Sequence, residues 1–304
     1  EAGNAATPTT LASITGLTSG STVTVNDSKD ATGGVQALTV GYKDLEAAAT
    51  IDVNSVKAAT GAVTITNVTA ATIDFAKDAS FTAGGINAAN TKSLTITGAD
   101  AVTTGNITAA NIETVSATAA KALSVSTINS ATANKLTTVN LTSTTEGVTA
   151  TTIGLAANTE TLNVTINAAK DISQTGAINS TKVGNISAVS TGGTASVAAA
   201  AIVGANATTM GDVTITAKTD AITGTIGNTT LATLGTVSMT STDGKVAFTA
   251  INAKDTGGIT VNASAKTTID NGSGAAATVI NDGGNITASL AGAAAKVNYT
   301  VATK

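Results

Sequence analysis

The 304-residue sequence lacks several residue types on which common functional sites depend. It has no cysteine and no histidine, so it can form no disulfide and lacks the usual ligands of structural zinc. Histidine is also the commonest general base, and cysteine is the usual thiol nucleophile. All 15 basic residues are lysine, which excludes bidentate recognition of phosphate or carboxylate by arginine. We therefore expect that the chain is not an enzyme.

Aromatic and charged residues are also scarce. Aromatic residues make up 2% of the chain and charged residues 11%, with a formal net charge of −4. Nucleic-acid-binding proteins carry basic patches, so this charge argues against a nucleic-acid partner. The sequence contains no apolar run long enough for a transmembrane helix, so we expect no membrane insertion.

The residues that are abundant favour β-structure. Apolar residues make up 42% of the chain, and because aromatics are few the core must consist of Val, Ile, Leu and Ala. Threonine is very common, and Thr, Val and Ile all favour strands. The same β-branched residues lose rotamer freedom in helices, which makes long helices unfavourable. These observations predict an all-β protein.

A seven-residue pattern recurs along the chain, as in TKSLTIT at 91–97. Its fourth position is aliphatic and recurs every 18 to 27 residues, at Leu94, Val115, Val139, Leu162, Ile186, Val213, Val237, Ile259, Val279 and Val297. Such a period is typical of one coil of a parallel β-helix. Similar copies lie upstream at 20–26, 35–41 and 60–66. The sequence therefore predicts a parallel β-helix (β-solenoid) with 18–27 residues per coil.

Alternation within the pattern predicts which side chains face the core. Positions four and six should point inward, and position five should point outward. The outward residues are Thr95, Ser116, Asn140, Asn163, Ser187, Thr214, Ser238 and Thr260. We expect Asn140 and Asn163 to tolerate substitution. Further aliphatic residues later in each coil suggest three faces, with corners at Gly, Asn and Asp.

A β-sandwich or a string of immunoglobulin-like domains is the alternative architecture. The single proline, the few aromatics and the even repeat argue against it, as does the absence of the tryptophan that such domains usually bury. We assign residues 1–19 to an initial segment and residues 20–304 to one continuous solenoid. Neither end shows an obvious cap, and no leader peptide is visible at Glu1, so we expect this chain to be part of a longer one.

The copies IETVSAT at 112–118, LTTVNLT at 136–142 and TETLNVT at 159–165 carry a family resemblance. They resemble the Thr/Ala/Val-rich repeats of S-layer proteins exported by bacterial type I secretion (the RTX-like kind), and the likeness runs from about residue 20 to residue 304. The resemblance implies an extracellular location on the bacterial surface and calcium-dependent folding. It also implies a lattice in which copies of the chain are the partners. Contact with lipopolysaccharide would then come through a segment not present here.

The calcium-binding repeat G-G-x-G-x-D of that family has no clean copy in this sequence. Eight clustered Asp and Asn residues are instead candidate Ca²⁺ ligands, because calcium takes six to eight oxygen ligands. They are Asn26, Asp27, Asp30, Asp270, Asn271, Asn281, Asp282 and Asn285. The same residue types are common in turns, where they bond their own backbone, so structural corners are the alternative interpretation.

Several other functions fit single features of the sequence. Asp212 is a candidate carboxylate for cleaving a polysaccharide, but glycoside hydrolysis needs two, and the matching positions of neighbouring repeats are Asn185 and Thr236. A threonine ladder could bind ice, although Asn140, Asn163, Asp212 and Gly258 interrupt it. We predict a structural surface protein that self-assembles into an S-layer. The alternative is an extracellular adhesin rod that contacts a host or carbohydrate.

Overall fold

The computed structural model describes residues 14–26, 38–54, 62–75, 81–129, 135–202, 207–228, 230–244, 246–253, 255–263, 279–280, 286–290 and 300–301. Its regular elements are all β-strands, and none of the described residues forms a helix that could span a membrane. The chain divides into two compact units, Glu1–Thr149 (unit 1) and Ala150–Lys304 (unit 2). Each unit is described separately.

The strands of unit 1 vary widely in length. They are β1 (Ile14–Leu17), β2 (Val23–Asn26), β3 (Leu38–Asn54), β4 (Ala62–Phe75), β5 (Phe81–Ala88), β6 (Ser93–Gly98), β7 (Val102–Thr108), β8 (Thr114–Ala119), β9 (Leu123–Val125), β10 (Ile128–Asn129) and β11 (Thr138–Ser143). Strand β12 (Val148–Ala150) spans the division between the units. The first described strand, β1, lies within the predicted initial segment and pairs with β3.

Unit 2 contains the remaining strands. They are β13 (Ile153–Gly154), β14 (Thr161–Ala168), β15 (Ile172–Gln174), β16 (Ile178–Asn179), β17 (Lys182–Ser190), β18 (Ala195–Ile202), β19 (Thr209–Met210), β20 (Val213–Ala217), β21 (Ala221–Gly227), β22 (Thr233–Ser241), β23 (Val246–Asn252), β24 (Asp255–Ala263), β25 (Val279–Ile280), β26 (Ile286–Leu290) and β27 (Thr300–Val301). Strands β25 and β27 pair with each other in a separate two-stranded sheet.

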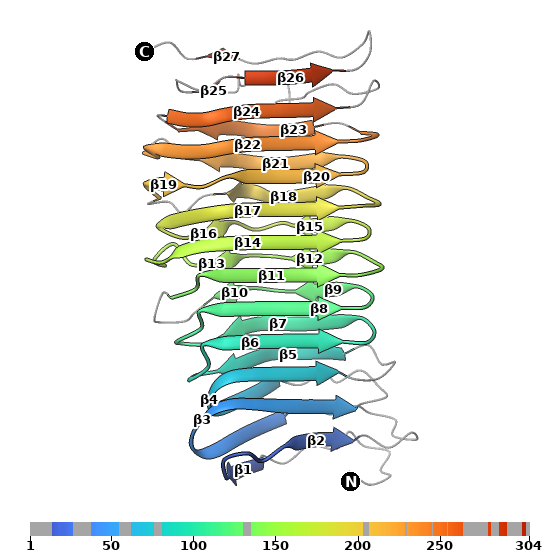
Figure 1. Cartoon of the computed structure of the whole chain (residues 1–304), viewed down its shortest axis with the longest axis vertical. Coiled ribbons are helices and arrows are strands. Elements are labelled where there is room, and N and C mark those ends of the chain that lie inside the picture. The colour runs from blue at the N-terminus through green and yellow to red at the C-terminus, as the bar shows by residue number, and fades with distance from the viewer. Residues whose placement is uncertain are drawn as a thin grey trace. The chain divides into compact units, whose positions relative to one another are not determined.

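Parallel pairing between successive coils confirms the predicted β-solenoid. In unit 1, β6, β8 and β11 stack as a first run, and β7 pairs with β9 in a second run and with β10 in a third. In unit 2 the first run is β14, β17, β20, β22, β24 and β26, and the second is β15, β18, β21 and β23. The third run begins with β13 and β16 and continues in the later parts of β18, β21 and β23. Within each unit, Figure 1 shows the first-run strands in parallel, one above the other.

The predicted alternation is confirmed in the described first-run strands. The eight described fourth positions from Leu94 to Ile259 are at most 2% exposed. The sixth positions are also buried, at Ile96, Ala117, Leu141, Val164, Ala188, Ile215, Met239 and Val261. The fifth positions are half-buried, apart from the exposed Asn163. The side chain of Val279 and all of Val297 lie outside the described residues, so the prediction stays untested there.

The spacing between Leu162 and Ile186 does not measure one coil step. Strand β14 pairs Leu162 with Val183, and after a register shift it pairs Val164 with Ile186. Residues Gly184 and Asn185 therefore face the single residue Asn163, which is the arrangement of a β-bulge. The fourth position of one repeat here lies beside the sixth position of its neighbour. Both positions point inward, so the alternation survives the shift.

Two of the upstream look-alike copies lie on a different face from the others. Leu38 and Val63, the fourth positions of the copies at 35–41 and 60–66, pair with each other, and Val63 pairs with Ile86. Ile86 then pairs with Ile107, which places this column in the third run. The later part of β4 supplies the first-run partners of β6. The number of pattern copies therefore does not equal the number of coils.

Candidate functional site

The candidate calcium ligands lie almost entirely outside the described residues. Only the backbone of Asn26 is described, at the end of β2, where it pairs with Asn54. The residues Asp27, Asp30, Asp270, Asn271, Asn281, Asp282 and Asn285 lie outside. Within the described part of the chain, no group of three or more acidic side chains is placed to hold a metal ion. Calcium binding at these clusters stays a prediction.

Side-chain oxygens form a ladder along the bulged edge of the first run in unit 2. Asn163 Oδ1 accepts the backbone N–H of Asn185 at 2.9 Å, and Asn185 Oδ1 accepts that of Asp212 at 3.0 Å. Asp212 Oδ1 in turn accepts both the N–H and the hydroxyl of Thr236, at 2.7 and 3.0 Å. The N–H groups that the ladder satisfies belong to exposed residues of the next coil. The ladder starts at the bulge and continues beyond it, since β20 pairs with β22 without a register shift.

A glycine precedes each upper member of this oxygen ladder because there is no room for a Cβ. A Cβ on Gly184 would lie 2.2 Å from Asn163 Oδ1, and one on Gly211 would lie 2.4 Å from Asn185 Oδ1. A Cβ on Gly235 would lie 2.4 Å from an oxygen of Asp212. The recurring glycine before Asn, Asp or Thr was the sequence signal for this ladder. The ladder gives Asn163 a structural role. The sequence had led us to expect instead that Asn163 would tolerate substitution.

Hydroxyl groups at the corner after the first run bond within the chain. Ser143 and Ser190 each donate to a carbonyl of the preceding coil at 2.6 Å, and each accepts an N–H three residues ahead at 3.1 Å. Ser241 bonds in the same way to the Thr219 carbonyl and the Gly244 N–H. All three serines are at most 3% exposed. Their sequence context is shared, since a threonine follows each of them.

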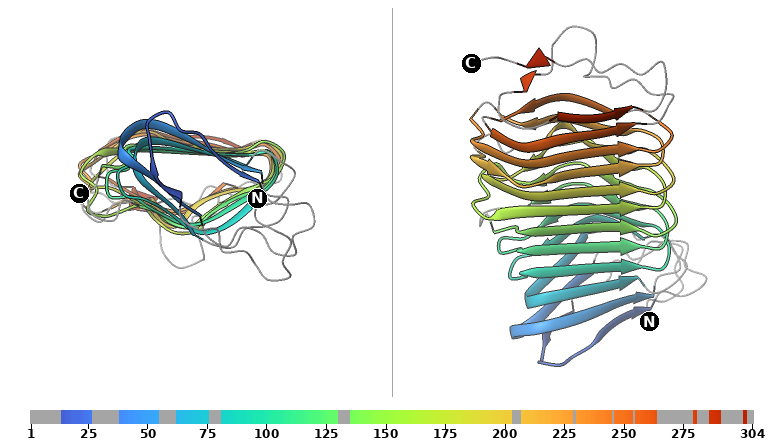
Figure 2. Two further views of the ribbon diagram at one scale, coloured as in Figure 1. Left: turned by 90° about the horizontal axis from the view of Figure 1, so that it is seen from below. Right: turned by 45° about the horizontal axis from the view of Figure 1, so that its top comes forward.

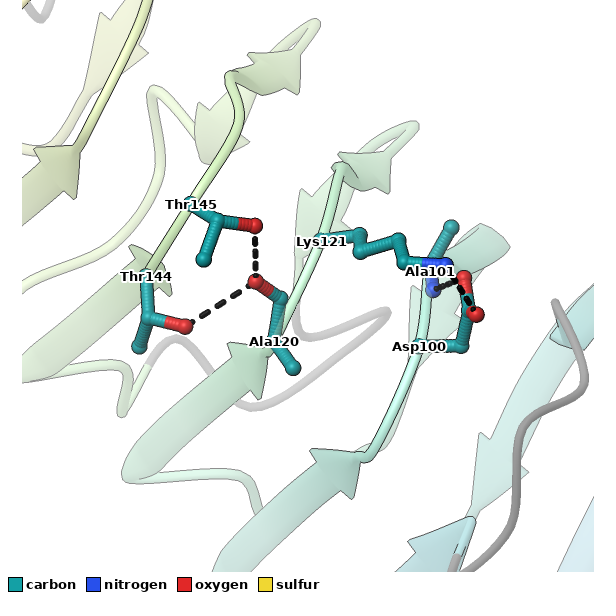
Figure 3. Close-up of polar contacts among 6 residues, drawn as sticks. All are labelled: Asp100, Ala101, Ala120, Lys121, Thr144 and Thr145. Atoms are coloured by element: carbon teal, nitrogen blue, oxygen red, sulfur yellow. Dashed lines mark hydrogen bonds and ion pairs between the residues drawn. The ribbon is translucent and has the colours of Figure 1, made fainter.

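The same corner in unit 1 shows further bonds between coils (Figure 3). Thr144 and Thr145 both donate to the Ala120 carbonyl, at 2.9 and 2.7 Å. Lys121 Nζ lies 2.6 Å from Asp100 Oδ2, and the other oxygen of Asp100 accepts the N–H of Ala101. The hydrogen bond from Lys121, with the one from Ala101, lowers the pKa of Asp100. The polar groups at this corner are therefore bonded to neighbours in their own chain.

The outward side chains of the first run form two rows in unit 2. Row one is Thr165, Ser187, Thr214, Ser238 and Thr260, in register from strand to strand. Row two is Asn167, Val189, Thr216, Thr240 and Asn262. We call these ten residues the hydroxyl face. The sequence had suggested that Asn163 interrupts the row of hydroxyl groups. Asn163 instead belongs to the oxygen ladder, so it does not interrupt row one. Figure 2 shows the parallel strands that carry the face.

The hydroxyl face differs from the corners in how its polar groups are used. None of the ten residues, all of them described, forms a side-chain hydrogen bond within the chain. The corresponding rows of unit 1 are Thr72, Thr95, Ser116 and Asn140, and Asp74, Thr97, Thr118 and Thr142. There Thr97 donates to Asp74 at 2.5 Å. A hydroxyl both donates and accepts hydrogen bonds, so the unit 2 rows can bond to an external polar surface.

Asp212 is one exposed carboxylate in a ladder whose neighbours are Asn185 and Thr236. Glycoside hydrolysis needs a second carboxylate facing the first, which these two neighbours do not supply.

Comparisons of the chain with protein-family models, with curated proteins and with solved structures each gave no match.

Proposed function

We propose that this chain is a structural segment of a bacterial S-layer protein, located on the cell exterior, and that it works by self-association into a lattice. The observation that carries the proposal is the hydroxyl face of unit 2. Its polar groups repeat from strand to strand and have no hydrogen-bond partner within the described chain. The repeats that resemble those of S-layer proteins support the same function.

The low charge of the chain favours association. Charged residues make up 11% of it, against about 25% in ordinary soluble domains. Few charged side chains therefore have to leave water when two copies meet, and removing a charge from water is costly. A lattice also needs many weak, identical contacts rather than one strong contact, and the strand spacing of about 4.8 Å repeats each contact regularly.

Calcium ions are the proposed cofactor, and lattice neighbours are the proposed partners. The chain has 19 acidic residues against 15 lysines, so acidic groups on neighbouring copies repel one another unless a cation bridges them. Calcium suits such contacts because its ligands are oxygens. Attachment to lipopolysaccharide is assigned to a segment outside this chain.

Electron microscopy of the purified chain, with sedimentation velocity on the same samples, tests the proposal. We expect ordered sheets or large assemblies in calcium. A chelator should dissociate them while the circular dichroism signal of the strands persists. Isolated particles at every protein concentration, with and without calcium, would contradict self-assembly and favour an adhesin rod. Collapse of the strand signal on chelation would instead make calcium a ligand needed for folding.

A further inference from the structure

The geometry points to the hydroxyl face of unit 2 as the contact surface between copies, with the same face of a second copy as its partner. This inference rests on the proposed self-association and adds to it the surface and the pairing. The first support is chemical. Seven of the ten residues are serine or threonine, two are asparagine, one is valine, and none is charged. Hydroxyls and carboxamides donate and accept hydrogen bonds, so this face is complementary to itself.

When a face contacts the same face of a second copy, the contact has two-fold symmetry. Each contact between one residue and a second is then matched by the same contact with the two copies exchanged. A face carrying charges of one sign would repel its copy in that arrangement. In unit 1 the equivalent rows include the carboxylate of Asp74, which already accepts a bond from Thr97. In unit 2 the ten residues carry no charge, and the exposed carboxylate of Asp212 lies beside row one rather than within it.

The regular register of the rows makes the face suitable for such a contact. From Val164 onward β14 pairs with β17 without a further shift, and Val213 to Ala217 of β20 pair one for one with β22. Strands are about 4.8 Å apart, and alternate residues along a strand are about 6.7 Å apart. The polar groups therefore form a regular grid, and a two-fold related copy can match this grid at many points.

The size of the face predicts a weak contact. Five strands cover about 24 Å, and two rows spaced about 6.7 Å apart cover about 13 Å, so the face measures about 300 Å². Stable interfaces bury about 800 Å² on each partner. One pair of faces should therefore associate only at high protein concentration. Such a contact suits a lattice, where other contacts add to it.

Hydrogen bonding within the chain does not compete for this face. The corner serines Ser190 and Ser241 bond to their own backbone, and Asn163 and Asn185 accept backbone N–H groups. The rows between these two structural zones form no side-chain bond in the described chain. Between the corner and the oxygen ladder, a second copy thus finds hydroxyl and carboxamide groups that no bond within the described chain occupies.

The test uses two matched double variants of the whole chain. The first, Thr214→Lys with Thr260→Lys, adds two charges to row one of unit 2 on strands separated by β22. The second, Thr95→Lys with Asn140→Lys, adds the same charges to row one of unit 1 on strands separated by β8. Sedimentation velocity over a protein concentration series measures association. Circular dichroism and thermal melting check that both variants fold.

We expect the unit 2 variant to associate at least about tenfold more weakly than the wild type, because like charges meet across identical faces. The unit 1 variant should associate like the wild type. A Thr214→Glu, Thr260→Glu variant should also associate more weakly when alone, and mixing it with the lysine variant should restore association. Recovery on mixing is specific to contact between two copies of the same face.

Three results would overturn the inference. Equal association of the unit 2 variant and the wild type would leave self-assembly standing and assign it to another surface, as would equal weakening of the two lysine variants. Failure of the mixed variants to associate would exclude face-to-face pairing. A wild type that never associates would refute the proposed function itself.

Discussion

The first run is built differently in the two units. In unit 1, β8 pairs with β6 and with β11 residue for residue across all six positions. In unit 2, β14 meets β17 through a register shift, and the oxygen ladder begins at Asn163. The comparison shows what the oxygen ladder requires at each step. A side-chain oxygen accepts a backbone N–H of the next coil and a glycine leaves space for that oxygen, both at the bulge and where β20 pairs with β22 without a shift.

Each unit buries aliphatic side chains on the inward side of its first run. The largest expected effect tests this common feature. Val139 of unit 1 and Val213 of unit 2 are each 0% exposed. Changing either to Asp buries an unpaired carboxylate, which should cost about 4 kcal/mol or more. Chemical denaturation followed by circular dichroism measures the loss. The outward changes Asn140→Asp and Thr214→Asp are the controls, and equal tolerance of inward and outward changes would refute the assigned facing.

The next effect should appear only in unit 2. Gly211→Ala places a Cβ 2.4 Å from Asn185 Oδ1 and 2.8 Å from the backbone carbon of Gly184. We expect a loss of about 1–3 kcal/mol, since the backbone must shift. Gly257→Ala is the control in the equivalent position of β24, where the nearest atom lies 3.2 Å away and the oxygen ladder has ended. Similar losses in denaturation of the two variants would show that the ladder does not constrain Gly211.

A smaller effect separates two outward asparagines. Asn163 accepts the backbone N–H of Asn185, whereas no side-chain bond of Asn140 is present in the described chain. Asn163→Ala should therefore cost about 1 kcal/mol, and Asn140→Ala should cost less than about 0.5 kcal/mol. Urea denaturation of the two variants side by side measures the difference. Equal costs would mean that water replaces the carboxamide of Asn163 without loss.

The smallest effect concerns the exposed corner of unit 1. The hydrogen bond from Lys121 lowers the pKa of Asp100 below its ordinary value of 3.8. The carboxylate therefore stabilises the fold above that ordinary value, and the contribution disappears as pH falls through the lowered pKa. Asp100→Asn should reduce stability slightly at pH 7 and make no difference at more acidic pH, as followed by urea denaturation. Lys121→Gln is the control and should remove most of this pH dependence. A difference that grows on acidification would contradict the assignment.

The sequence determined the coil architecture and the facing of most first-run residues. Alternation has a period of two residues, and the spacing of Leu94, Val115 and Val139 is visible without any contact map. These features are local, since a strand that buries one face must place apolar residues at every second position. For the same reason the sequence could predict that Asn140 and Thr214 point outward.

Only the tertiary structure decided which coil residues lie beside one another. The short pattern around Val63 fits any inward face, and its place in the third run depends on its neighbour Ile86 in the next coil. The pairing of Val164 with Ile186 likewise depends on a bulge, whose stability comes from contacts about one coil apart. A period of two residues carries no information about such contacts. The hydroxyls of Ser190 and Thr214 look alike in sequence, and only stacking of the coils assigns one to the chain's own backbone and leaves the other facing outward.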